Sequence, residues 1–90
     1  MYKVVFSKQA DKDKKLLKAA KLDRKAKDIL DLLAENPFRT PPPYEALVGN
    51  LHGLYSRRIS FQHRIVYDVN VKEKTVHILR MWTHYDMHGK

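Results

Sequence analysis

A few polar residues in the second half of the chain could perform acid–base and phosphate chemistry. Arg57, Arg58 and Arg64 lie on two adjacent predicted strands, the His84–Tyr85 pair follows the last predicted strand, and Glu45 is a lone carboxylate after a proline run. An imidazole or a carboxylate can move a proton near neutral pH, and a guanidinium binds phosphate oxygens as a planar fork. A tyrosine can stack on a base or bond to a phosphate. Together these groups suit chemistry on RNA.

Each of these residues also has an ordinary explanation. An arginine on a strand is often solvated, and here it could pair with Asp68; a carboxylate in a loop is usually exposed. Chain ends tend to fray, and in that case Trp82 would simply pack on the sheet edge. In the functional interpretation, Trp82 anchors the tail that follows it. Because strand side chains alternate between faces, Arg64 can share an open face with one of Arg57 and Arg58.

The pattern of apolar and turn residues predicts the elements that must position these groups. Ser7 suits a helix N-cap, and Asn36–Pro37 should end the second helix because the residue before proline avoids the α region. All four prolines fall in the loop 37–53, which should be extended and stiff. The predicted order is βααβββ, with helices on one face of an antiparallel sheet, an α+β fold: strand 2–6, helices 8–20 and 23–35, and strands 54–60, 63–71 and 75–82.

Length, charge and composition restrict the class of protein. Ninety residues make one domain, 1–90, and the net charge of +8 favours an anionic partner. The absence of cysteine excludes a disulfide scaffold, a thiolate zinc site and a cysteine nucleophile, and it favours a cytoplasmic location. No apolar run is long enough for a signal peptide or a membrane span. His84 and His88 are four residues apart, but they follow a strand and no carboxylate cluster accompanies them. We therefore expect no metal and no cofactor.

Two linked motifs resemble those of a known family. The first reads N-L-H-G-L-Y-S-R-R-I over residues 50–59, and the second reads H-R-I-V-Y over residues 63–67. The closing His84–Tyr85 pair and the carboxylate Glu45, a few residues before the Asn–Leu pair, complete the pattern. In this combination the chain resembles the YoeB/Txe toxins, a branch of the RelE-type toxins of bacterial type II toxin–antitoxin systems, over nearly its whole length.

The resemblance implies a metal-independent endoribonuclease that cuts mRNA in the ribosomal A site and stops translation. In such toxins the ribose 2′-OH attacks the adjacent phosphate, which leaves a 2′,3′-cyclic phosphate and a free 5′-OH. Carried over to this chain, Glu45 is the general base, Arg64 stabilises the phosphorane, and His84 is the general acid. Tyr85 would orient the substrate, and Arg58 would assist at the phosphate. His63 belongs to the motif but lies on the core side, so we interpret it as structural or as a hydrogen-bond partner of a residue next to the site.

The resemblance also implies partners. They are the ribosome and mRNA, and a YefM/Phd-like antitoxin that is acidic and partly disordered; operator DNA would be bound only through the antitoxin complex. A homodimer is one option for assembly, and no membrane contact is expected. The residues 8–27 carry nine lysines and arginines, which could be a solvated face or a contact for ribosomal RNA. We assign RNA contacts to Arg57, Arg58, Lys12, Lys15 and Lys18.

Two other functions remain open at this stage. A non-catalytic protein of the same fold would bind RNA or an antitoxin without cutting. A basic DNA-binding module is the third hypothesis, although no recognition-helix pattern stands out.

Overall fold

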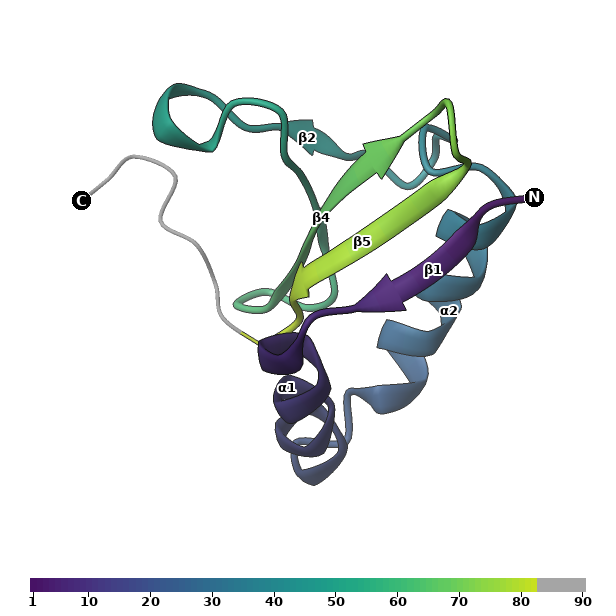
Figure 1. Ribbon diagram of the computed structural model, residues 1–90. Coiled ribbons are helices and arrows are strands. Elements are labelled where there is room, and N and C mark those ends of the chain that lie inside the picture. Colours follow the sequence, from purple (N-terminus) through teal and green to yellow (C-terminus); the bar gives the residue numbers. More distant parts are fainter. Residues whose placement is uncertain (83–90) are drawn as a thin grey trace.

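Two helices follow directly on the first strand and cover one face of a five-stranded sheet in the computed structural model, which describes residues 1–82 (Figure 1). The other face of the sheet carries no helix from this part of the chain. In chain order the elements are β1 (Lys3–Phe6), α1 (Lys8–Ala19), α2 (Asp23–Glu35), β2 (Glu45–Ala46), a 3-10 turn (Gly49–Leu51), β3 (Tyr55–Arg58), β4 (Arg64–Asn70) and β5 (Thr75–Arg80).

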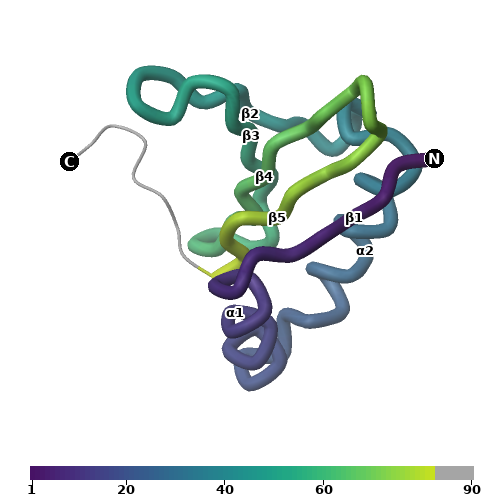
Figure 2. The backbone as a smooth tube through the Cα atoms, in the orientation of Figure 1, coloured from purple at the N-terminus to yellow at the C-terminus, as the bar shows by residue number. Residues whose placement is uncertain are grey.

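The sheet has the order β1-β5-β4-β3-β2, which Figure 2 shows along the backbone. The predicted α+β class and the antiparallel meander β3–β4–β5 are confirmed. The sheet as a whole is mixed rather than antiparallel, because β1 pairs with β5 in parallel. The first strand joins the last through a connection that contains both helices, and this permits the parallel direction. The short strand β2 was not predicted, because two residues show no periodicity.

The helices begin and end close to the predicted residues. The Ser7 hydroxyl accepts the Ala10 N–H at 3.0 Å, as an N-cap should, and donates to the Leu79 carbonyl at 2.9 Å. Helix α2 begins at Asp23, and Asn36 after it is extended, as the following proline requires. Within residues 1–82, neither helix has the length and apolar character needed to cross a bilayer.

The hydrophobic core lies between the helices and the sheet. Strand alternation sends one set of side chains towards the helices, including Ile65, Tyr67 and Ile78, which are fully buried. Leu17 from α1 and Leu33 from α2 pack on this set. The alternate positions of β3 and β4 therefore face away from the helices, and these positions include Arg58 and Arg64.

A buried carboxylate joins α1 to the end of β5. Asp13 is fully buried, and its Oδ2 accepts bonds from Arg80 Nε at 3.0 Å and from the backbone N–H groups of Met81 and Trp82 at 2.9 and 3.3 Å. Burial by itself would raise the pKa of Asp13. The hydrogen bonds from Arg80, Met81 and Gln9 outweigh it, so the pKa lies below the ordinary 3.8. The ionised carboxylate therefore stabilises the fold.

We expect Asp13→Asn to lower the free energy of unfolding by about 2 kcal/mol at pH 7, because charged hydrogen bonds are lost in the interior. The folded-state pKa of Asp13 is depressed, so its contribution is complete above the unfolded pKa and is lost as the pH falls through the folded one. The difference between parent and variant should therefore shrink below about pH 4.

Urea unfolding between pH 7 and pH 3 measures this difference. Asp31→Asn is the matched control, because Asp31 is exposed and pairs with Lys27 on the surface of α2. A difference for Asp13→Asn that stays constant down to pH 3 would contradict the assignment.

Candidate active site

An ion pair joins Glu45 on β2 to Arg64 on β4 on the open face of the sheet. Arg64 Nη1 donates to Glu45 Oε1 at 3.0 Å and to Ser56 Oγ at 3.3 Å. The side chain of Glu45 is 58% exposed and that of Arg64 is 20% exposed. The carboxylate can thus be reached from solvent, while the guanidinium is held by Glu45 and Ser56. Within residues 1–82, Oε2 of Glu45 has no hydrogen-bond partner.

Strand register explains why these residues meet. Glu45 lies opposite Ser56 in the β2–β3 pair, and Arg58 lies opposite Arg64 in the β3–β4 pair. Ser56 and Arg58 are two residues apart, so they share a face. A cleft of about 240 Å³ opens on this face of the sheet. It is lined by Pro43, Tyr44, Glu45, Ser56, Arg58 and Arg64.

The electrostatics of this cleft favour an anion. Arg58 and Arg64 are like charges directly opposite on neighbouring strands, an arrangement that destabilises a sheet. One carboxylate, Glu45, offsets part of this charge through Arg64. A phosphate between the two guanidinium groups would remove the repulsion and accept bidentate hydrogen bonds.

Arg57 is not where the RNA-contact assignment requires it. It is buried with 1% of its surface exposed, and it points to the core side of β3. Its guanidinium binds three backbone carbonyls and the Tyr67 hydroxyl. The alternation that places Arg58 with Arg64 sends Arg57 inward, so Arg57 cannot contact RNA on the open face.

The end of β5 brings Trp82 against the predicted structural histidine. The rings of His63 and Trp82 lie 4.2 Å apart, and His63 Nδ1 lies 3.0 Å from Ser60 Oγ. His63 is half-buried and lies outside the cleft, which fits a structural position. The predicted general acid His84 and the predicted orienting residue Tyr85 fall in residues 83–90, outside the described part of the chain.

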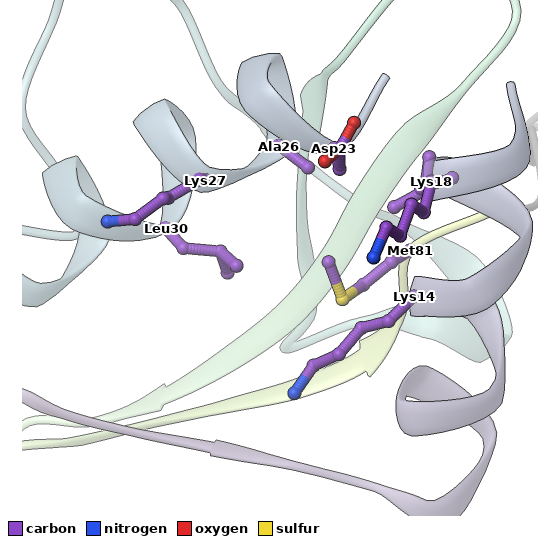
Figure 3. Close-up of a pocket in the computed structure, with 8 residues that line it drawn as sticks. Lys14, Lys18, Asp23, Ala26, Lys27, Leu30 and Met81 are labelled. Atoms are coloured by element: carbon purple, nitrogen blue, oxygen red, sulfur yellow. The ribbon is translucent and has the colours of Figure 1, made fainter. Parts of the chain in front are cut away.

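The predicted RNA-binding lysines lie in the helical layer. Lys12, Lys15 and Lys18 are exposed on α1, across the sheet from the cleft. Lys18 also borders a second, more apolar cleft between the helices (Figure 3). There Leu30 and Met81 point into the space, and the amino groups of Lys14 and Lys18 lie at its border. The basic charge therefore occupies two separate surfaces.

Two features of the site were missed or left aside at the sequence level. Ser56 holds Arg64 from β3, although alternation already placed it with Arg58. Tyr44 lines the cleft and contacts Phe38 and Tyr55 at ring distances of 5.9 and 5.7 Å. Within residues 1–82, no three His, Asp or Glu side chains gather as a metal site would require.

Residues 5–85 match the family model of the YoeB-like toxin of bacterial type II toxin-antitoxin system. The chain belongs to this family. The resemblance to this family is thereby confirmed over residues 5–85. A curated relative, Toxin YoeB of Synechocystis sp. (strain ATCC 27184 / PCC 6803 / Kazusa), is 40% identical over 57 residues. That alignment covers 63% of this chain and 59% of the relative.

Solved structures of the family have the same fold. The YoeB/ParE toxin from Agrobacterium tumefaciens superposes with a TM-score of 0.82 at 27% identity, covering 92% of this chain and 99% of that one. YoeB in the heterotetrameric YoeB–YefM complex from Staphylococcus aureus gives 0.77 at 32% identity, covering 94% and 99%. The YoeB dimer from the same organism gives 0.78 at 32% identity, covering 93% and 98%.

The two adjacent arginines should respond differently to substitution by lysine. Arg57→Lys is expected to lower the free energy of unfolding by about 2 kcal/mol or more, because an ammonium cannot replace a buried fork of donors. Arg58→Lys should change it by less than about 0.5 kcal/mol, since Arg58 is exposed. Urea unfolding measures the free energy of unfolding of the two variants. Equal decreases would refute the assignment of Arg57 to the core and Arg58 to the surface.

Proposed function

We propose that this YoeB-family protein is a ribosome-dependent mRNA endoribonuclease that cuts the message in the ribosomal A site and inhibits translation. The observation that carries the proposal is the cleft in which Glu45, Arg58 and Arg64 meet on the open sheet face. It places an accessible carboxylate beside two guanidinium groups, of which that of Arg64 is held in place. A base and a cation are two of the three groups that in-line phosphoryl transfer needs, and the third is an acid.

In the proposed reaction, Glu45 takes the proton from a ribose 2′-OH. The 2′-oxygen attacks the adjacent phosphorus, and the bond from phosphorus to the 5′-oxygen breaks. Arg64 and Arg58 hold the phosphoryl oxygens and stabilise the charge that develops on them. The products are a 2′,3′-cyclic phosphate and a free 5′-OH. No metal or cofactor is needed for these steps.

The 5′-oxygen that leaves must receive a proton, and this role falls to His84 in the proposal. Tyr85 would orient the substrate beside it. Both assignments rest on the match of the closing His–Tyr pair to the family pattern, and an imidazole suits the task because it can donate a proton near neutral pH.

The proposed partners follow from the charge distribution and from the relatives. The exposed Lys12, Lys15 and Lys18 would contact ribosomal RNA phosphates from the helical side while the cleft engages the message. The Staphylococcus aureus relative forms a complex with YefM, and it has also been solved as a dimer. For this chain we propose a YefM/Phd-like acidic antitoxin, partly disordered when free, with operator DNA bound only through that complex, and action in the cytoplasm.

Substitution of the cleft residues should abolish cleavage but preserve the fold. Glu45→Gln and Arg64→Ala are each expected to slow cleavage of mRNA on programmed ribosomes by about a hundredfold or more, because general base and charge stabilisation are lost. His84→Gln should do the same. Single-turnover assays measure the rates, with Glu73→Gln and Arg24→Lys as exposed controls. Folded variants that all cut at the parent rate would support the non-catalytic alternative.

The chemistry of the products provides an independent test. A message with a single 2′-deoxynucleotide before the scissile phosphate should remain uncut at that bond, since the attacking hydroxyl is missing. Mass spectrometry of the normal products should show a 2′,3′-cyclic phosphate. A 3′-OH with a 5′-phosphate would instead indicate attack by water and would overturn the proposed mechanism.

A further inference from the structure

We infer that Arg57 is a positioning residue for the cleavage reaction. Its buried guanidinium holds the proline-rich segment 37–42 in the conformation that delivers Glu45 to Arg64. The inference rests on the proposed function, because it assigns Arg57 to the machinery of the same site. It replaces the RNA contact that the sequence suggested for this residue.

The guanidinium of Arg57 donates four hydrogen bonds. Three go to carbonyls of the segment 37–42, and one goes to the Tyr67 hydroxyl, which itself bonds to this segment. Nη2 donates to the carbonyls of Pro37 at 2.9 Å and Arg39 at 2.8 Å, and Nη1 donates to the Pro42 carbonyl at 2.7 Å. Nε donates to the hydroxyl of Tyr67 at 3.1 Å, and that hydroxyl donates to the Pro37 carbonyl at 3.2 Å. Three carbonyls of the segment thus converge on one cation.

The segment leads directly to the carboxylate. Pro42 lies three residues before Glu45, and between them the Tyr44 ring packs 5.1 Å from the Arg57 guanidinium and edge-on to Tyr55. Strand β2, which carries Glu45, pairs with β3 through only two residues. One further backbone bond, from the Leu47 N–H to the Leu54 carbonyl at 2.9 Å, continues this pairing. So short a pairing holds a side chain in register only weakly, and the contacts of Arg57 add a further constraint.

The cost of burying Arg57 supports a role beyond packing. A buried cation loses its hydration, and within residues 1–82 its guanidinium meets no carboxylate. An apolar residue would fill the core at a lower cost. The planar arginine fork, however, can bind several carbonyls at fixed angles, and a lysine cannot reproduce this geometry. The arrangement is suited to shaping a loop.

A double-substitution cycle tests whether Arg57 acts through Glu45. Arg57→Lys should slow single-turnover mRNA cleavage about tenfold or more, because displacing a catalytic group by about 1 Å is costly. Ribosome affinity should stay within about twofold of the parent, since the docking surfaces are intact. In a Glu45→Gln background, Arg57→Lys should have less than about a twofold further effect on the rate. Equal effects in both backgrounds would overturn the inference.

Tyr67→Phe provides a second variant if Arg57→Lys fails to fold. It removes the hydroxyl that Arg57 Nε and the Pro37 carbonyl share. Its matched control is Ile78→Val, a buried β5 substitution of similar cost that does not touch the segment. We expect Tyr67→Phe to slow cleavage severalfold with unchanged ribosome affinity, and Ile78→Val to leave the rate unchanged. Equal rates for these two variants would refute the positioning role.

The experiment separates this inference from the proposed function. If Glu45→Gln cuts as fast as the parent, the proposed mechanism fails, and the positioning role fails with it. If Glu45→Gln is slow while folded Arg57→Lys and Tyr67→Phe retain the parent rate, only the positioning role fails.

Discussion

A buried cation constrains the edge of the sheet that carries Glu45. The guanidinium of Arg57 has lost its water and can be satisfied only by acceptors that the chain brings to it. Those acceptors are carbonyls of the proline-rich segment and the hydroxyl of Tyr67. The segment must therefore fold back against β3, and the short strand that follows it adds to the sheet edge. The position of Glu45 beside Arg64 depends on this requirement.

A second buried charge lies in α1, beside the end of β5. Asp13 joins α1 to the backbone just after β5, where Trp82 then stacks on His63. The two charges differ in how they are satisfied, because Asp13 has a cationic partner in Arg80 while Arg57 has neutral ones. Arg57 holds the segment before β2, and Asp13 holds the backbone just after β5.

The net charge of +8 is divided between surfaces with different geometry. The helical layer carries exposed lysines on flexible stems, which suit contacts with phosphates that carry no sequence information. The open sheet face carries Arg58 and Arg64 at fixed register positions, where two guanidinium groups oppose each other. Such an arrangement lowers the stability of the free protein and suits the binding of one phosphate.

The sequence alone determined the order of the helices and the longer strands, the helix limits and the open face that Arg64 shares with one of Arg57 and Arg58, because these follow from local periodicity, capping and strand alternation. The parallel pairing of β1, the strand at Glu45 and the burial of Arg57 were decided only by the tertiary structure. Local patterns cannot show them, since each depends on groups distant in the chain. The pattern of two adjacent arginines indicates surface charge, and it cannot show that carbonyls 15 to 20 residues away surround one of them.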